Sequence, residues 1–205
     1  MNLQWVGHYL SRPVNDYWYA GLFSEQRKQT YRCDFSNLYA LLPVEAWQHI
    51  ESNSNKLRVL YTLRHPMKRL WSHLKFHLEV TKQLDLLETW KPADFEEFMR
   101  RPFMWDNAEY GQCLRTMREG LSEGNLKAIF FENLHADQRG SLTDLEDYLD
   151  IPTFKYPPAL LNRQVNKSKE IPMPDFFKEI FARDTARIGR ELEDQGLILP
   201  ASWAE

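Results

Sequence analysis

The sequence has 205 residues, a length that suits one medium-sized domain better than two. Hydrophobic residues make up 43%, charged residues 27% and aromatic residues 14%, which excludes a disordered chain. The net charge of −3 argues against a protein whose main role is to coat nucleic acid or an anionic membrane. No apolar run reaches the roughly 18 residues of a membrane span, and two cysteines are too few for a disulfide scaffold. We expect a single cytoplasmic globular domain over residues 1–205.

The first part of the chain is expected to be helical. The spacing of aromatic residues predicts a helix over 14–28, and Pro43 opens a second helix that runs to about Ile50. The clearest strand follows at residues 57–63 and is almost continuously apolar. Such a strand is typical of a parallel sheet that helices cover on both faces.

The rest of the chain alternates predicted helices with one more strand. Helical patterns cover about 67–82, 93–101, 105–120, 141–149 and 174–195, a second buried strand covers 126–131, and the proline-rich residues 150–174 predict a loop. This order predicts an α/β domain with a mostly parallel sheet. Ligands of such sheets bind beyond the carboxyl ends of the strands, where Arg64 and Glu132 lie.

A phosphate site is predicted where the first strand meets the next helix. Arg64 ends the strand and a helix begins directly after it, so a guanidinium and a helix N-terminus would face the same anion. Lys68 and Ser72 are four residues apart and share a helix face, which adds a charge and a hydroxyl. The alternative is that Arg64 and Arg69 pair with surface carboxylates, and that Ser72 only packs on the sheet.

The same stretch resembles a known family. The pattern Arg64-x-Pro-x-x-Arg-x-x-Ser72 after a buried strand is similar to the 3′-phosphate-binding motif of sulfotransferases that use 3′-phosphoadenosine 5′-phosphosulfate (PAPS). Residues 129–134 and 149–152 resemble the family's late strand and the helix after it. Residues 165–168 resemble the loop that closes over the nucleotide in bacterial and carbohydrate-type members.

The resemblance implies a function, a fold and a set of residues. It implies an enzyme that transfers a sulfuryl group from PAPS, without a metal, to a hydroxyl or amine acceptor, with a carbohydrate favoured. The implied fold is the three-layer sandwich of P-loop nucleotide-binding proteins. Arg64, Lys68 and Ser72 would bind the 3′-phosphate, Asn166, Lys167 and Ser168 would close over it, and His8 is the candidate base because imidazole titrates near neutrality.

The chain also departs from the family pattern. The family's first strand leads into a loop of the type Pro-Lys-x-Gly-Thr-Thr around the 5′-phosphosulfate, and none of the eight glycines here is followed by Thr-Thr. The position of the family's catalytic glutamate falls on Val6. The chain is therefore expected to lack the first strand and phosphate loop, as a truncated or diverged member. The competing hypothesis is an inactive remnant that binds a nucleotide or a protein partner, whereas a nucleotide kinase would need a Walker A loop.

A few other residues carry weaker expectations. Glu132 is expected to hold a loop through hydrogen bonds from backbone N–H groups. Asp34 either replaces a family glutamate near the acceptor or caps a turn. His73 and His77 are four residues apart, but no third ligand accompanies them, so a metal site is not expected. The sequence identifies neither the acceptor molecule nor the oligomeric state.

Overall fold

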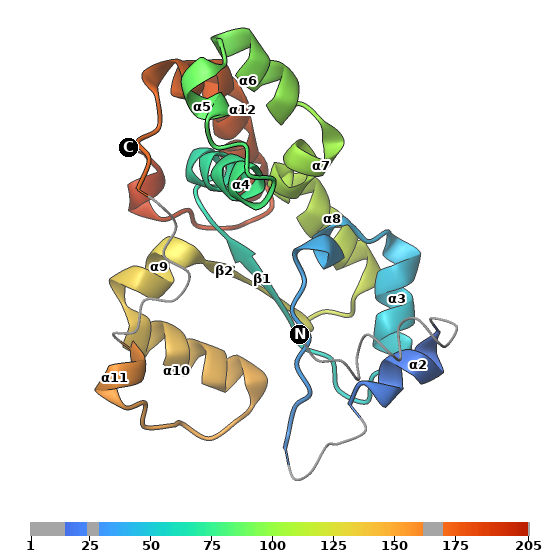
Figure 1. Ribbon diagram of the computed structural model, residues 1–205. Coiled ribbons are helices and arrows are strands. Elements are labelled where there is room, and N and C mark those ends of the chain that lie inside the picture. The colour runs from blue at the N-terminus through green and yellow to red at the C-terminus, as the bar shows by residue number, and fades with distance from the viewer. Residues whose placement is uncertain (1–14, 24–28, 162–169, 205) are drawn as a thin grey trace. The chain divides into compact units, whose positions relative to one another are not determined.

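The computed structural model describes residues 15–23, 29–161 and 170–204 (Figure 1). These residues belong to two compact units, Met1–Ser36 and Asn37–Glu205. In the first unit, α2 (Asp16–Gly21) begins at Asn15, whose side-chain oxygen accepts the backbone N–H of Trp18 at 2.9 Å. The helix is shorter than predicted, because the chain leaves it at the C-cap residue Leu22.

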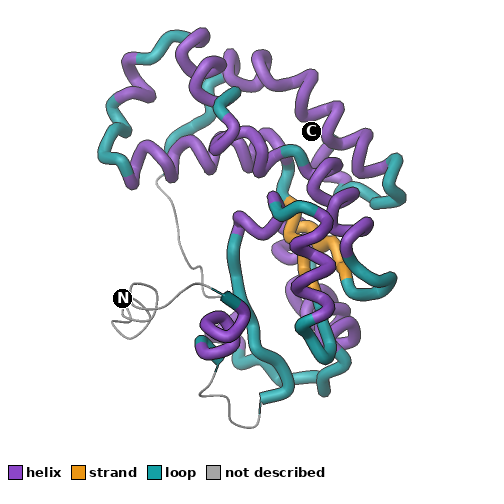
Figure 2. The backbone as a smooth tube through the Cα atoms, turned by 90° about the vertical axis from the view of Figure 1, so that its right-hand side faces the viewer, coloured by secondary structure: helices purple, strands orange, loops and turns teal. Residues whose placement is uncertain are grey.

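The second unit contains two parallel strands, as the sequence predicts. β1 (Val59–Leu63) pairs with β2 (Leu126–Phe130), with Leu63 opposite Phe130, and Figure 2 shows the two strands side by side. The prediction that β1 is buried on both faces is wrong for the described residues. Leu63 is fully buried, but Leu60 keeps 39% of its surface exposed. The sheet formed by the described residues has only two strands, which leaves one face of β1 in partial contact with solvent.

Helices and helical turns make up most of the second unit. In chain order they are η1 (Asn37–Leu41), α3 (Val44–Ser52), α4 (Pro66–Val80), α5 (Leu86–Thr89), α6 (Pro92–Met99), α7 (Pro102–Trp105), η2 (Asp106–Ala108), α8 (Tyr110–Gly120), α9 (Phe131–Ala136), α10 (Gln138–Leu149), α11 (Pro158–Leu161), α12 (Asp175–Glu193) and η3 (Ala201–Trp203). The predicted helix over 105–120 is interrupted, because Glu109 has a non-helical ψ of 60°. The short α11 lies inside the predicted loop, and α9 begins where the second strand was expected to continue.

Two long helices form the centre of the core. α4 buries Leu70, Leu74 and Leu78, which are four residues apart and therefore face the same side. α12 packs against this face with Phe177 and Phe181, both fully buried. The predicted apolar face of the last helix is thus confirmed. Because α4 starts directly after β1, this packing also fixes the junction between strand and helix.

α8 is positioned by a glycine on its inner side. A Cβ atom at Gly120 would lie 2.8 Å from the carbonyl oxygen of Val44, so only glycine lets α3 come this close. At its other end, the Gly111 carbonyl accepts the side-chain N–H of Gln195, which follows α12, at 3.0 Å. α8 therefore lies between α3 and α12 and presents its remaining side chains to β1 and to solvent.

Candidate functional site

The site is built where β1 passes into α4. Pro66 occupies the first turn of α4, and the Nδ1 atom of His65 accepts the backbone N–H of Met67 at 3.2 Å. Burial, followed by the nearby charge of Lys68, lowers the pKa of His65. The ring therefore stays neutral at pH 7 and keeps the lone pair with which Nδ1 caps the helix.

Glu132 connects this junction to the end of β2 and to the C-terminal turn. Its Oε1 atom accepts the backbone N–H of His65 and its Oε2 atom accepts the indole N–H of Trp203, each at 3.0 Å. Burial by itself would raise the pKa of the Glu132 carboxyl. The two N–H donors lower the pKa by more than burial raises it, so the pKa lies below its usual 4.5. The prediction that Glu132 holds a loop through a backbone N–H group is confirmed. Its bond to Trp203 was not predicted.

Arg64 lies in this junction without a negative partner. Its guanidinium lies over the ring of Phe131 with Cζ 5.1 Å from the ring centre. The side chain is half-buried, and its Nε atom is buried without a hydrogen-bond partner. No carboxylate of the described residues pairs with it, so the alternative in which Arg64 forms a surface ion pair finds no support here. A partly desolvated cation of this kind is stabilised when an anion binds to it.

One face of α4 adds further positive charge and a hydroxyl. Lys68, Ser72 and Lys75 follow one another at spacings of four and three residues, so they lie along the same side of the helix. Burial, followed by the positive charge of Arg64, lowers the pKa of the Lys75 ammonium, and Glu170 opposes this shift. Lys75 is therefore close enough to Arg64 to feel its charge. Sequence reasoning missed Lys75, although its helical spacing from Lys68 and Ser72 is the signal that would have found it.

A pair of buried tyrosines, one on β1 and one at the start of α8, lies beside the junction. Tyr110 is 2% exposed and is the first residue of α8. Burial raises the pKa of Tyr110 to about 12, so the phenol is neutral at pH 7. The ring of Tyr61 on β1 meets it edge-on, with ring centres 6.1 Å apart. Burial also raises the pKa of Tyr61, so both phenols are neutral at pH 7 and this pair adds no charge to the junction.

The other residues singled out from the sequence divide into two groups. His8, Asn166, Lys167 and Ser168 lie outside the described residues. Asp34, in the first unit, accepts the hydroxyl of Tyr19 at 2.8 Å. The ring of His77 packs between those of Phe98 and Phe103, and the described residues hold no group of three side chains suited to a metal ion. No helix in the described ranges is long and apolar enough to span a membrane.

An α/β unit with an unpaired arginine beyond the carboxyl ends of parallel strands is typical of a protein that binds an anionic ligand there. Comparisons with known proteins agree with this class. The family model of the sulfotransferase domain matches residues 35–175, more than half of the chain. The chain therefore belongs to the sulfotransferase domain family.

The fold comparison gives a consistent result. A crystal structure of a sulfotransferase from Alicyclobacillus acidocaldarius matches with a TM-score of 0.72 and 18% sequence identity, covering 98% of this chain and 78% of that one. At this identity the match shows the fold alone. No curated protein matches the chain.

Proposed function

We propose that the protein transfers a sulfuryl group from PAPS to a hydroxyl or amine acceptor, with a carbohydrate as the favoured acceptor. The observation that carries this proposal is the Arg64 guanidinium, half-buried, lying over Phe131 and unpaired among the described residues. In the proposal Arg64 and Ser72 bind the 3′-phosphate of the nucleotide, and Lys68 adds a positive charge. Planar guanidinium groups and helix N-termini are the groups with which proteins commonly hold phosphate.

The remaining residues complete the proposed site. Asn166, Lys167 and Ser168 would close over the 3′-phosphate, and His8 would serve as the base. In the reaction the acceptor oxygen or nitrogen bonds to sulfur, the bond between sulfur and the bridging phosphate oxygen breaks, and the base takes the acceptor's proton. The products are a sulfated acceptor and 3′-phosphoadenosine 5′-phosphate (PAP). No metal is needed for these steps.

Residues 1–205 hold no Lys-x-Gly-Thr-Thr sequence for the 5′-phosphosulfate. In our proposal the chain is one sulfotransferase-like domain of P-loop type that lacks the first strand and this loop. The same observation favours a second candidate function, a sulfotransferase-like protein that binds the nucleotide without transferring its sulfuryl group. By analogy with an oxyanion hole, losing one stabiliser of the transferred group lowers the rate by about 10² to 10³.

Calorimetric titration with PAP tests the nucleotide site. We expect Arg64→Ala to weaken PAP binding by about 10- to 100-fold, since a charge-assisted contact is worth roughly 1.5–3 kcal/mol. Arg101→Ala is the matched control, because Arg101 is an exposed arginine whose guanidinium pairs with Glu97 one turn away and lies over the Phe98 ring, both on α6. Adenosine 5′-phosphate, which lacks the 3′-phosphate, should bind wild type and Arg64→Ala equally weakly.

Two outcomes would contradict the nucleotide site. One is equal affinity of the wild type for PAP and for adenosine 5′-phosphate. The other is a folded Arg64→Ala variant with unchanged PAP affinity. A separate assay of PAP release from PAPS then distinguishes the enzyme from the nucleotide-binding protein, since only the enzyme forms PAP in the presence of an acceptor.

A further inference from the structure

The segment after α12 returns to the β1–α4 junction. α12 ends in a turn in which Gly196 has a φ of 82° and the backbone N–H of Leu197 donates to the Leu192 carbonyl at 3.1 Å. This is a common way for a glycine to end a helix and redirect the chain. The side chains of Leu197 and Leu199 then pack against the core, and the single turn η3 follows with Trp203 at its end. The segment therefore brings a tryptophan onto the junction.

Trp203 contacts both sides of this junction. Its indole N–H donates to Oε2 of Glu132 at 3.0 Å, and its ring centre lies 5.6 Å from that of His65. It also meets Phe130, the last residue of β2, at right angles with ring centres 5.3 Å apart. Aromatic pairs at such distances add stability beyond that of the area they bury. One side chain thus links the start of α4 with the end of β2.

The groups that Trp203 contacts are direct neighbours of Arg64. His65 is the next residue in the chain, and its backbone N–H is bound by the same carboxylate that accepts the indole N–H. Phe131 begins α9 directly after β2, and the Arg64 guanidinium lies over its ring with Cζ 5.1 Å from the ring centre. A shift of the indole would therefore disturb both the backbone and the ring that orient the guanidinium.

The shared carboxylate makes these contacts depend on one another. Each oxygen of Glu132 accepts one N–H group, so the plane of the carboxylate is fixed from both sides. With the indole N–H removed, the carboxylate is free to rotate and its bond to the His65 backbone is less well directed. Binding groups need to be held within roughly 0.5 Å of the productive position by the residues around them. Trp203 is therefore placed to supply such support to the Arg64–His65 turn.

The turn that carries Trp203 has little stability of its own. η3 comprises only three residues, and short 3₁₀ turns have poorer hydrogen-bond geometry than α-helices. Ile198 before it is 90% exposed, and Ala201 and Ala204 are also exposed. Segments with few buried contacts open at a lower free energy than the core does. We therefore expect η3 to open and close on the junction while the rest of the unit stays folded.

We propose that Trp203 is a positioning residue for the nucleotide site, and that docking of η3 on Glu132 and binding of the 3′-phosphate at Arg64 favour each other. The proposal rests on the proposed function, because it takes the ligand of Arg64 to be the nucleotide's 3′-phosphate. It adds a residue that acts through Glu132 and His65 without touching the ligand. Coupling between two binding events is reciprocal, so the effect must be measurable from both sides.

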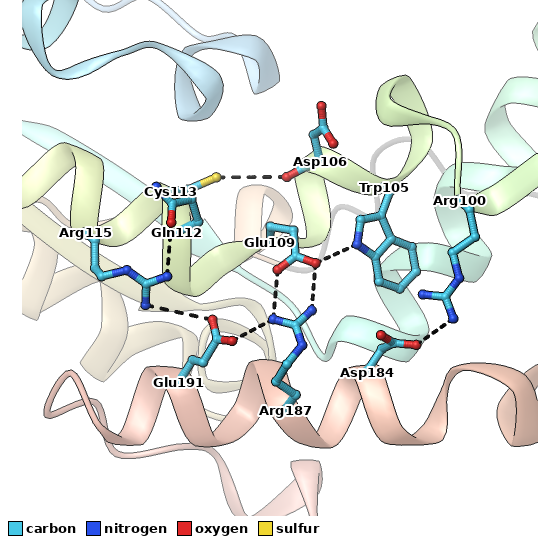
Figure 3. Close-up of polar contacts among 10 residues, drawn as sticks. All are labelled: Arg100, Trp105, Asp106, Glu109, Gln112, Cys113, Arg115, Asp184, Arg187 and Glu191. Carbon is cyan, nitrogen blue, oxygen red and sulfur yellow. Dashed lines mark hydrogen bonds and ion pairs between the residues drawn. The ribbon is translucent and has the colours of Figure 1, made fainter.

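Calorimetric titration with PAP measures the first side. Trp203→Phe keeps an aromatic ring and removes the indole N–H, and we expect PAP to bind about 3- to 10-fold more weakly, as for one hydrogen bond to a partly exposed charged group. Adenosine 5′-phosphate should bind both proteins equally. Trp105→Phe is the matched control, because it removes an indole N–H that donates to Glu109 in the ion-pair network of Arg187 (Figure 3). It should leave PAP affinity unchanged.

Hydrogen exchange of the Trp203 indole N–H measures the second side, by NMR on the ¹⁵N-labelled wild-type chain, and so requires no variant to fold. Saturating PAP should slow this exchange about 3- to 10-fold, because it favours the docked turn by the same factor by which docking favours PAP. Saturating adenosine 5′-phosphate should leave the exchange unchanged. In Arg64→Ala, saturating PAP should no longer slow the exchange, since the coupling begins at the guanidinium.

A double-mutant cycle tests whether the effect passes through Glu132. In a Glu132→Gln background, Trp203→Phe should change PAP affinity by less than about 2-fold, because the carboxylate that joins the two donors is already absent. In a Glu119→Gln background, which removes a carboxylate from an exposed position of α8, Trp203→Phe should keep its full effect. A full effect in both backgrounds would overturn the assigned route.

Three results would overturn the proposal as a whole, and they are distinguishable from one another. Equal weakening of PAP binding by Trp203→Phe and Trp105→Phe would mean that the loss reflects general stability. Unchanged PAP affinity in Trp203→Phe, together with indole exchange that PAP does not slow, would leave the nucleotide site intact and make η3 a structural cap alone. Absence of PAP binding by the folded wild type would overturn the nucleotide site and this proposal with it.

Discussion

Glu132 offers the sharpest test of how the junction is held together, through the substitution Glu132→Gln. The wild-type carboxylate accepts two N–H groups, one from the His65 backbone and one from the Trp203 indole, each at 3.0 Å. The amide of glutamine has one accepting oxygen and one N–H₂ group. It can therefore satisfy only one of the two donors, and its N–H₂ group must face the other.

The size of the effect follows from the charge and exposure of the group. A hydrogen bond to a charged acceptor contributes about 1.5–3 kcal/mol when it is well buried. Glu132 is half-buried, so solvent screens part of this energy. We expect Glu132→Gln to lower the free energy of unfolding at pH 7 by about 1–2 kcal/mol.

The effect should depend on pH in a defined direction. The pKa of Glu132 in the folded protein lies below its usual 4.5, because the N–H donors outweigh the opposing effect of burial. A lowered folded-state pKa gives stability that is present above the unfolded value and is lost as the pH falls through the folded value. The difference between wild type and variant should therefore shrink once the pH falls below about 4.5.

Urea unfolding of both proteins at pH 7 and at about pH 3.5, with Glu119→Gln as the control, measures this difference. PAP titration of the folded variant reports whether the Arg64–His65 turn remains positioned for its ligand. The reasoning is refuted if Glu132→Gln unfolds at the same urea concentration as the wild type at pH 7. A stability difference that stays constant down to pH 3.5 would equally exclude the carboxylate as its cause.

Two further predictions concern the packing around α8. Gly120→Ala should lower the free energy of unfolding by about 1–3 kcal/mol, because the new Cβ would lie 2.8 Å from the Val44 carbonyl oxygen. Gly189→Ala is the control: its new Cβ would meet Leu199 at 3.5 Å, so this variant should be neutral or stabilising in thermal unfolding. Glu109 forms an ion pair with Arg187 at 2.7 Å, and Glu109→Gln should lower the free energy of unfolding by about 1–2 kcal/mol, a value discounted for the partial exposure of this pair. A double-mutant cycle with Arg187→Gln should show that the effects of the two substitutions are not additive.

The elements that the sequence predicted correctly are those with a strong local pattern. The apolar run of β1 and the proline after it locate both the strand and the start of α4. β2 was also found, but its end was placed one residue too late, because Phe131 continues an aromatic run although it begins α9. The helix predicted over 105–120 could not reveal the break at Glu109, since nothing in the local sequence marks it.

The site was partly predictable for the same reason. Arg64, Lys68 and Ser72 belong to a local motif, and Glu132 lies at a strand end, so sequence position alone drew attention to them. Lys75 lies beyond the motif and was missed. The contact between Glu109 and Arg187 joins residues 78 positions apart, and no local pattern predicts which carboxylate meets which guanidinium across that distance.

The contact between Trp203 and Glu132 has a practical consequence for work with this protein. The tryptophan lies in the last described turn of the chain, yet its indole N–H reaches the carboxylate that holds the backbone of His65. Proteolytic trimming to Pro200, or an affinity tag that displaces this turn, would leave one carboxylate oxygen of Glu132 without its donor. Binding constants measured on such material would then describe a loosened Arg64–His65 junction, so the integrity of the C-terminus should be verified by mass spectrometry before any titration.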